Sequence, residues 1–583
     1  MAKNFNNRPA NTVNTDFYNP YTFVELNNDN YVMSLDSDEE KDLDFVHDIP
    51  FENGYSGKIQ VEFESMTKFC VLGSGEHHTN VNNRYYVPGS SIKGMLRSIT
   101  EMITFANMKN GIEDNRYSMR DLTPGSPYEL KNGEQRPGFL FKVNGKYYIQ
   151  ETTARKVSYS EMEDMIEGFA SKRDSFERAK DISTKYALIN NKKFMGDNGI
   201  WFFSGSMKTK NPAKSKQHEY LFSIPSKFSD SAFVVDETDD ETGVFDDFVF
   251  IHEKENPNSS WNYWKEKVLK KVDYNKFDDV SRDGIVPVFF REEDGEIIDF
   301  GLSYLYRQPY YNTVHDLLPK TFLDDENELD LVQGMFGFVN VHGKSLKGRI
   351  VVGNAMLDES IRPDGKAQTF IMGAPKPTFY PFYIEQKGNK KKTYFDDDAK
   401  ISGYKRYLIR DNAIESRIPR SNTTSTFYPM PEHTIFSTEI YFHNLKDYEL
   451  GALLCAITFN KNQDKCFHSL GYAKPFGYGK IKVNRCALIE KDLQANDEKN
   501  NGKDIEFFYK AFDTLIDDCG IRKIFDKVIS DLKHISSGNY VSKVGGIRYP
   551  KTGMETKNPN EKNNEFVAIK KSNLNINDFS PIK

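Results

Sequence analysis

The chain contains 583 residues, of which 38% are hydrophobic, 14% aromatic and 28% charged, and its formal net charge is −7. This length exceeds one compact core, so we expect two or more domains, or one domain with large insertions. The sequence has no apolar run of the ~18 residues that a membrane helix needs, no apolar signal segment at its N-terminus, and five cysteines without CxxC or Cys/His zinc spacing. These properties predict a soluble cytoplasmic protein with reduced thiols, no structural metal and no membrane partner.

Charge is distributed unevenly along the chain. Residues 336–485 contain 23 Lys and Arg against 14 Asp and Glu, a local net charge of +9, whereas acidic residues concentrate at 36–44, 236–247 and 324–330. A basic segment inside an acidic chain is compatible with a polyanionic partner, because binding depends on local charge. The acidic runs are adequately explained as solvated surface.

Alternating apolar and polar side chains predict strands at 57–64, with its apolar residues inward, and at 434–442. A short apolar run predicts a further strand at 248–251. Residues 504–536 have the pattern of two amphipathic helices, and the Lys/Asn-rich tail at 546–583 is expected to be flexible. The chain is therefore expected to mix strands and helices.

The stretch 85–103 combines a turn with a helix. Pro88-Gly89 ends an extended run, and Ser90 or Ser91 is the expected N-cap, because a serine hydroxyl accepts an orphan backbone N–H at a helix start. The residues that follow place one apolar stripe on the helix: Ile92, Met95, Leu96, Ile99, Met102 and Ile103. We therefore predict an amphipathic helix that packs on the core.

Lys93 and Arg97 lie one helical turn apart, beside this apolar stripe. A helix N-terminus with free N–H groups, two hydroxyls and nearby cations can hold a phosphate. The alternative is an ordinary amphipathic helix whose lysine and arginine are solvated. The polar loop at 72–80 precedes the helix and is expected to face the same ligand.

Two further segments indicate nucleic-acid contacts. Residues 374–410 interleave aromatic with basic residues and are predicted to fold back as a protruding hairpin, a composition that suits single-stranded nucleic acid, because bases stack on the rings while phosphates pair with the cations. A hairpin with one packed aromatic face is the alternative. Residues 470–483 form a loop with three glycines and three lysines, in which the backbone can approach a phosphate closely.

The order of these features resembles the RAMP superfamily of CRISPR-associated proteins, and most of all the repeated backbone subunits of type III effector complexes. Two motifs carry the resemblance, VPGSSIKGMLRS at 87–98 and LGYAKPFGYGKI at 470–481. In this family a proline-glycine-serine-serine-leucine-lysine-glycine signature opens the first helix, and a glycine-rich loop closes the core near its end. The resemblance covers roughly residues 55–105 and 331–485.

The resemblance implies an α+β fold: a ferredoxin-like, RRM-like RAMP core with a large α+β insertion, a thumb-like hairpin and a C-terminal helical extension. The predicted divisions are an N-terminal arm with an acidic loop at 1–50, the first part of the core at 51–104, the insertion at 105–330, the second part of the core at 331–490 with the hairpin at about 374–410, and C-terminal helices with a flexible tail at 491–583.

The function that the resemblance implies is a guide-RNA (crRNA)-binding subunit of a type III CRISPR antiviral effector complex, which holds the RNA backbone and helps present it for pairing with target RNA. Such contacts are independent of sequence, because phosphate binding fixes the register and base pairing reads the sequence. The implied partners are guide RNA, target RNA and other effector subunits, with no cofactor. The residues implied to bind RNA are Arg84, Ser90, Ser91, Lys93, Arg97, Lys347, Lys405, Arg406, Arg417, Arg420, Lys474, Gly477, Gly479 and Lys480.

Enzymatic activity stays open at this point. In target-cleaving members of the family, the loop after the first strand carries an aspartate that takes part in metal-dependent RNA cleavage, whereas this loop has Glu76, His77 and His78 and no aspartate. One alternative is an RAMP endoribonuclease that uses these three residues on guide precursor or target RNA, with a divalent metal if active, since imidazole titrates near neutrality. The other alternative is a protein-interaction scaffold in which residues 105–330 dock a neighbouring subunit.

Overall fold

The computed structural model describes residues 13–26, 33, 50–73, 75–108, 115–121, 128, 135–179, 182–189, 195–196, 199–200, 202–203, 218–235, 243–257, 259–319, 322, 329–339, 345–373, 376–388, 391–421, 423–489, 493–495, 502–552 and 564–582. The acidic run at 36–44 lies outside these residues, as do residues 236–242 and 324–328 of the other two. The chain divides into two compact units: unit 1 comprises Met1–Glu113, Leu317–Thr393 and Asp398–Lys583, and unit 2 comprises Asp114–Asp316 and Tyr394–Asp397.

Unit 1 is organised around an antiparallel sheet with the strand order β19-β24-β2-β26-β25. These strands are β19 (Ile350–Val352), β24 (Ile435–Leu445), β2 (Tyr55–Ser65), β26 (Lys480–Leu488) and β25 (His468–Ser469), and the short β27 (Gln494–Ala495) also pairs with β2. The strands predicted at 57–64 and 434–442 are confirmed. Ile59, Val61 and Phe63 of β2 are fully buried, as the alternation predicts.

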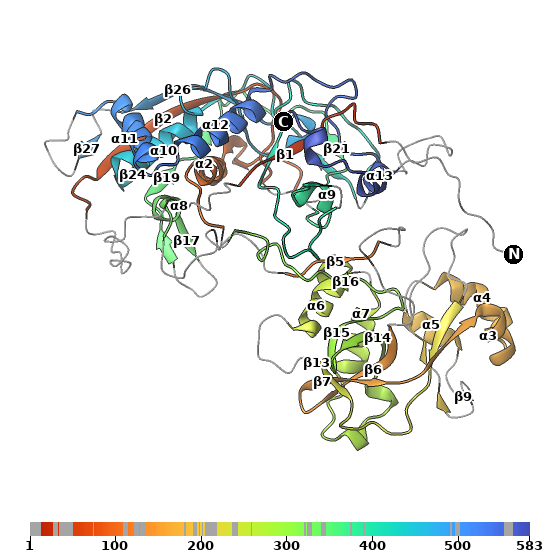
Figure 1. The fold of residues 1–583 in the computed structure, drawn as a ribbon. Helices are drawn as coiled ribbons and strands as arrows, with labels where there is room; N and C mark the ends of the chain where they lie inside the picture. The colour runs from red at the N-terminus through yellow and green to blue at the C-terminus, as the bar shows by residue number, and fades with distance from the viewer. Residues whose placement is uncertain are drawn as a thin grey trace. The chain divides into compact units, whose positions relative to one another are not determined.

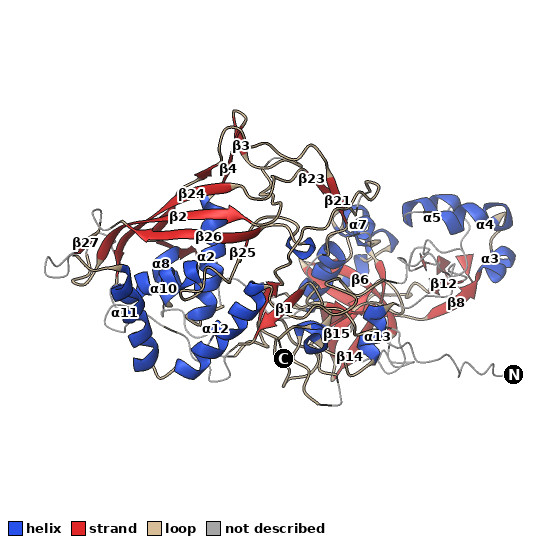
Figure 2. Ribbon diagram, turned by 90° about the horizontal axis from the view of Figure 1, so that it is seen from above, coloured by secondary structure: helices blue, strands red, loops and turns tan. Residues whose placement is uncertain are grey.

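Helices cover one face of this sheet (Figure 2). They are α2 (Gly89–Ile103), α8 (Leu331–Phe336), α10 (Asp447–Thr458), α11 (Ile505–Asp518) and α12 (Arg522–Ser537). The predicted apolar stripe of α2 is buried, and the two helices predicted at 504–536 are confirmed as α11 and α12. Along the chain, four strands of the sheet and two of the helices that cover it follow one another in the order β2, α2, β19, β24, α10 and β26.

The start of α2 lies against the edge strand β19. The helix begins at Gly89 with Pro88 as its N-cap and without a side-chain cap, so the predicted capping by Ser90 or Ser91 is wrong. The Gly89 N–H instead donates to Oδ1 of Asn354, 2.9 Å away. Because a side chain from a distant segment satisfies this orphan donor, the local serines are not needed for it.

The N-terminal strand β1 (Tyr21–Val24) pairs with β22 (Tyr404–Tyr407), and it lies beside C-terminal elements of the chain (Figure 1). The segment 374–410 therefore differs from the predicted hairpin. Among its described residues it contains the short helix α9 (Tyr380–Tyr383) and folds back through one isolated bridge, between Ile384 and Ile401. The sequence pattern of the segment gave no indication that its strand β22 pairs with β1, near the N-terminus of the chain.

The described part of the C-terminal tail also differs from the flexible segment that was expected. Residues 564–582 form the helix α13 (Glu565–Lys571) and the 3₁₀ turn η11 (Ile576–Phe579). Ile569, Ile576 and Phe579 are buried in one apolar cluster with Phe17 and Phe382. The tail is thus held by apolar burial against the N-terminal arm and α9.

Unit 2 contains two sheets. The five-stranded antiparallel sheet has the order β13 (Phe233–Val235), β7 (Lys146–Glu151), β6 (Arg136–Val143), β14 (Val286–Glu293) and β15 (Glu296–Gly301), and the three-stranded sheet has the order β11 (Phe202–Phe203), β12 (His218–Phe222) and β8 (Ala154–Ser158). Residues 248–251 are not the predicted strand, because they lie in the helix α6 (Val244–Phe250) and the π-helical turn that follows it. Phe248 and Ile251 are buried, while Val249 and Phe250 are only partly buried. This spacing of three residues is helical, and a run of four apolar residues is too short to distinguish it from a strand.

The remaining elements, given by their bounds, are β3 (Asn80–Val81), β4 (Arg84–Val87), β5 (Ser118–Met119), α3 (Tyr159–Met165), α4 (Phe169–Arg178), α5 (Ile182–Ile189), β9 (Met195–Gly196), β10 (Gly199–Ile200), η3 (Ile251–Glu255), α7 (Trp261–Trp264), η4 (Lys265–Leu269), η5 (Phe277–Asp279), η6 (Arg282–Gly284), β16 (Gln308–Pro309), β17 (Gly337–Val339), β18 (Ser345–Lys347), β20 (Ala355–Met356), β21 (Gln368–Phe370), β23 (Ser425–Phe427) and η8 (Lys474–Phe476).

We expect Gly89→Ala to destabilise unit 1, because a Cβ at Gly89 would lie 2.0 Å from the carbonyl oxygen of Val352. Forcing an atom into such a contact shifts the backbone and costs about 1–3 kcal/mol. Gly94→Ala is the matched control on the same helix, because a Cβ there meets nothing within 4 Å, and the change should stabilise the helix by up to about 1 kcal/mol. Urea denaturation of both variants measures the difference, and equal stabilities would contradict the assigned contact.

Candidate nucleic-acid interface

Arg406 and Lys474, two residues predicted to bind RNA, are brought together by the fold. Arg406 lies on β22, where it is paired with Thr22 of β1, and Lys474 begins the turn η8 in the glycine-rich loop. Both side chains are partly buried. Burial lowers the pKa of Arg406 to about 10, and burial together with the neighbouring charge of Arg406 lowers the pKa of Lys474.

Within the described part of the chain, this pair of cations has no carboxylate counterpart. Among the residues that the structure describes, no ion pair joins either side chain to a carboxylate, and one Arg406 N–H donates to the hydroxyl of Ser98 on α2 at 3.3 Å. Removing a cation from water without a partner is unfavourable, and a second cation beside it adds repulsion. The pair is therefore an electropositive site to which the described residues supply no carboxylate.

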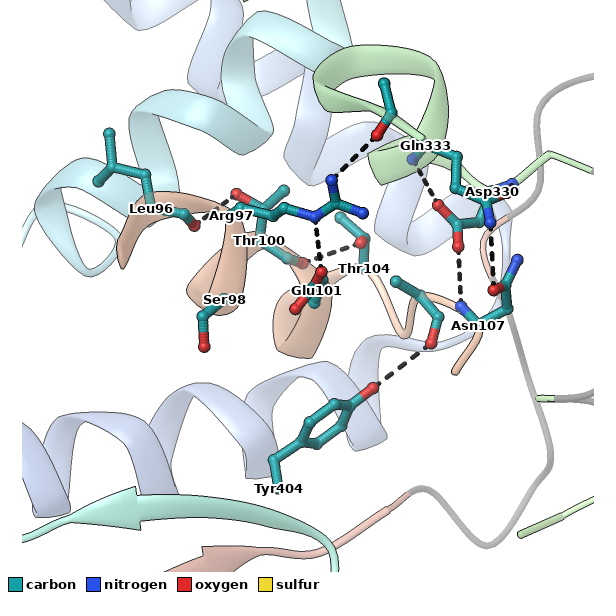
Figure 3. A network of polar contacts seen from close by, with 12 residues as sticks. Leu96, Arg97, Ser98, Thr100, Glu101, Thr104, Asn107, Asp330, Gln333 and Tyr404 are labelled. Carbon is teal, nitrogen blue, oxygen red and sulfur yellow. Dashed lines mark hydrogen bonds and ion pairs between the residues drawn. The ribbon is translucent and has the colours of Figure 1, made fainter. Parts of the chain in front are cut away.

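Two neighbours of this pair were not predicted from the sequence. Ser98 lies within α2, on a different side of the helix from Arg97 (Figure 3). His468 on β25 is fully buried, and burial lowers its pKa to about 4, with a small contribution from the charge of Arg406. Its Nε2–H donates to the carbonyl of Ile457 at 2.8 Å, and no described residue forms a hydrogen bond with its Nδ1. His468 is thus neutral near pH 7 and cannot compensate the two cations. Ser98 ends the motif at 87–98 but was not among the residues implied to bind RNA, and no sequence pattern marked His468.

Lys405 precedes Arg406 on β22 and points to the opposite side of the strand. Its Nζ lies 4.0 Å from the ring centre of Tyr21 and within 5.5 Å of those of Tyr383 and Tyr407, and it donates to the hydroxyl of Tyr383 at 2.8 Å. Burial lowers the pKa of Lys405 to about 8. The structure therefore gives this predicted RNA-binding residue a cage of aromatic rings within the protein.

Lys93 and Arg97 of α2 have partners in the neighbouring elements. Lys93 Nζ donates to the carbonyl of Ile350 at 2.9 Å, and burial, with the charge of Arg97, lowers the pKa of Lys93. Arg97 forms an ion pair with Glu101 at 2.8 Å and donates to the carbonyl of Gly337 at 2.9 Å (Figure 3). Lys347 is exposed, and its backbone is paired with Gly337. Arg97 thus contacts the start of the β17–β18 hairpin, Lys347 lies on it, and Lys93 contacts β19 just after it.

The helix α8, which supports this hairpin, starts at a buried carboxylate (Figure 3). Asp330 accepts hydrogen bonds from the backbone N–H of Gln333 at 2.7 Å and from that of Asn107 at 2.9 Å. Burial raises the pKa of Asp330 to about 6. The capping box formed with Gln333 fixes where α8 begins. It thereby helps to fix the position of the Gly337 carbonyl, which directly follows α8 and accepts the hydrogen bond from Arg97.

The glycines of the glycine-rich loop are required by the packing of the protein itself. Gly477 and Gly479 have φ values of +86° and +79°, and a Cβ would lie 2.3 Å from the Asn412 carbonyl at the first position and 1.8 Å from the Leu470 carbonyl at the second. Lys480 approaches Asp411 at 3.3 Å and lies over the ring of Phe467. Lys480 therefore has side-chain partners within the protein. For Lys474, the other lysine of this loop that is predicted to bind RNA, no ion pair or ring contact is found among the described residues.

The loop after β2 packs against Arg420 and Tyr428. Glu76 forms an ion pair with Arg420 at 2.9 Å, and its carbonyl accepts from the Tyr428 N–H at 3.0 Å. The ring of His77 stacks on that of Tyr428 with 4.9 Å between the centroids. The fold thus places an acid, an imidazole and a guanidinium together, and the sequence had placed Arg420 only among the RNA contacts.

His78 occupies a different position from its neighbour. It is fully buried, its Nδ1 accepts the Val71 N–H at 3.0 Å, and its Nε2 donates to the Tyr86 carbonyl at 2.9 Å. Burial lowers the pKa of His78 to about 4. A ring with both nitrogens engaged joins β4 to Val71 in the segment after β2 and offers no free site for proton transfer, so its role in this structure is to hold the loop.

The other predicted residues lie apart from these groups. Arg84 is exposed on β4 with Glu359 at 3.9 Å, and Arg417 is exposed. Ser90 is exposed and Ser91 is partly buried in the first turn of α2. Within the described part of the chain, no group of three or more His, Cys, Asp or Glu residues is placed to hold a metal ion, and no described helix is long and apolar enough to cross a membrane.

Comparison with known proteins agrees with the class of protein that the motifs indicate. Residues 71–275 match the model of the RAMP superfamily, which confirms the resemblance to this superfamily and overlaps its predicted range at residues 71–105. The match contains the motif at 87–98 and continues through most of the segment predicted as an insertion, whereas the motif at 470–481 lies outside it.

Among solved structures, the chain is similar to the crystal structure of Csc2 from Thermofilum pendens, with 14% identity and a TM-score of 0.13. The similarity covers 36% of this chain and 55% of that one, so the chain spans about half the length of this neighbour. At this TM-score the likeness carries no argument about the fold or the site. A search of curated proteins finds no match.

The pKa of His78 predicts a loss of stability in acid. An unfolded histidine binds a proton below about pH 6.5, whereas folded His78 binds it only near pH 4. The unfolded chain therefore holds more protons between these values, and the free energy of unfolding falls as the pH falls. Urea denaturation at pH 7 and pH 5 should show a decrease that is smaller by about 2 kcal/mol in His78→Gln than in the unmodified chain. An equal decrease in both would contradict the assignment.

Proposed function

We propose that this protein is a guide-RNA-binding subunit of a CRISPR effector complex, of the type III class, and that it holds the RNA backbone for pairing with target RNA. The observation that carries this proposal is the pair Arg406 and Lys474, which is partly buried and lacks a carboxylate partner among the described residues. Its partners are guide RNA, target RNA and neighbouring subunits of the complex.

A backbone phosphate fits the chemistry of this pair. A phosphodiester is a single negative charge with oxygens that accept N–H bonds, and such charge-assisted bonds are stronger than neutral ones. Because every nucleotide has the same phosphate, binding at this pair is independent of sequence. A protein that delegates sequence recognition to base pairing needs contacts of this kind.

The arrangement of the sheet supports a ferredoxin-like core for this function. The elements β2, α2, β19, β24, α10 and β26 follow one another as strand, helix, strand, strand, helix and strand. In the sheet these four strands have the order second, third, first, fourth. The RAMP superfamily match over residues 71–275 supports the CRISPR association, and the basic segment 336–485 supports a polyanionic partner.

Lys474→Met should lower RNA affinity without lowering stability. The change keeps the length of the side chain and removes one charge-assisted bond to phosphate, so the affinity for a single-stranded RNA oligonucleotide should fall about 10-fold or more. The slope of log K against log salt should decrease by about 0.7. Since the lysine charge is unfavourable in the unbound protein, the melting temperature should be unchanged or higher.

The matched control is Lys510→Ala, which removes an exposed lysine from α11 and should leave RNA affinity unchanged. Sequencing of RNA that co-purifies with the protein tests the wider proposal, and we expect small RNAs of uniform length. If Lys474→Met binds RNA as the unmodified protein does, or if the co-purified RNA is random, the proposal fails.

A second candidate function is an endoribonuclease, and the contact between Glu76 and Arg420 beside His77 favours it. A carboxylate, an imidazole and a guanidinium at one exposed loop are groups that acid–base cleavage of RNA uses. In that case His77→Ala abolishes cleavage of a labelled RNA and leaves its binding intact. Cleavage that persists in His77→Ala would exclude this assignment.

A further inference from the structure

The two ends of the chain hold the elements that carry Arg406 and Lys474. Like charges repel more strongly in a partly buried site than in water, so the two side chains would separate if their backbones were free. β22 keeps Arg406 in place through its pairing with β1, in which Thr22 lies opposite Arg406. The ends of the loop that carries Lys474 are held by hydrogen bonds from the N–H groups of Tyr472 and Gly479 to the carbonyls of Cys70 and Lys68. A further contact holds the loop next to Lys474 itself.

Arg410 supplies this contact. Its guanidinium donates to the carbonyl of Pro475, at 3.2 Å, and to the carbonyl of Ile547, at 2.9 Å. Pro475 directly follows Lys474, and Ile547 belongs to the C-terminal segment 545–549. Burial lowers the pKa of Arg410, and among the described residues no ion pair joins it to a carboxylate. These two carbonyls are thus the acceptors that tie the glycine-rich loop to the C-terminal segment.

The C-terminal segment is itself fixed by the N-terminal arm. The Tyr18 N–H donates to the carbonyl of Gly546 and the Arg548 N–H donates to the carbonyl of Tyr18, both at 2.9 Å. Further along, the hydroxyls of Thr22 and Ser580 are 2.6 Å apart and buried. The N-terminal arm therefore pairs with the C-terminal segment and with β22, so both cations are held by one connected set of contacts.

On the basis of the proposed function, we propose that Arg410 is a positioning residue for RNA binding. Together with the C-terminal segment 545–549, it holds Lys474 beside Arg406 so that both cations meet the same phosphate. The repulsion between the cations is then overcome when the protein folds and not when RNA binds. Such preorganisation increases affinity, because binding does not have to order the loop.

A double-mutant cycle tests this role in the full-length protein. Arg410→Met keeps the aliphatic stem and removes both hydrogen bonds, and we expect about a 10-fold loss of affinity for a single-stranded RNA oligonucleotide. In the Lys474→Met background the same change should have no further effect on the affinity or on its salt dependence, because its effect passes through Lys474. Arg410→Lys keeps one donor for a carbonyl and should restore part of the affinity.

Hydrogen exchange of the unbound protein provides a readout that does not depend on RNA. Arg410→Met should increase amide exchange in residues 471–480 and leave exchange in α10 unchanged. Additive losses in the cycle would mean that Arg410 contacts RNA directly or acts through general destabilisation, and would overturn the inference.

Failure of this inference can be separated from failure of the proposed function. If Lys474→Met weakens RNA binding and Arg410→Met does not, the positioning role is wrong and the proposed site stands. If neither change affects RNA binding, the proposed site fails and the positioning role fails with it.

Discussion

The contact on which unit 1 depends is the approach of the first turn of α2 to the edge strand β19. Gly89 leaves room for the Val352 carbonyl, and Lys93 reaches across to donate to the carbonyl of Ile350. An edge strand with open backbone groups can pair with other chains, and here the helix start covers part of that edge. The glycine and lysine of the PGSSIKG sequence therefore have a packing role, because one must be small and the other long.

The parts of the fold that were predictable from the sequence are those in which one element buries one face. β2, β24, α2 and α11 all show the period of their secondary structure, and the buried side of each follows from it. The parts that were not predictable depend on partners distant in the chain. β22 pairs with β1, and the C-terminal residues Ile576 and Phe579 are buried with Phe17. The apolar run 248–251 was not predictable for another reason: it lies in α6 and the π-helical turn after it, but its four residues fit a strand equally well.

For the candidate site, the sequence predicted the types of residue and not their neighbours. Lys405 and Arg406 are adjacent and equally basic, yet strand alternation sends one into a cage of tyrosines and the other towards Lys474. Glu76, His77 and His78 are also consecutive, and only His78 is buried with both nitrogens bonded. Assigning such residues to opposite sides requires the register of the strand or loop, which depends on the tertiary structure.

Exposed and partly buried cations act on a polyanion in two different ways. Exposed residues such as Lys347 and Arg417 attract it over a range that salt limits to about 8 Å at physiological ionic strength. Arg406 and Lys474 are partly buried, so their field is screened less, and the energy of holding them together without an anion is already present in the folded chain. A bound phosphate relieves that energy only where both cations face it. Under the proposed function, the exposed residues thus favour association, while the partly buried pair determines where along the protein the backbone of a bound RNA lies.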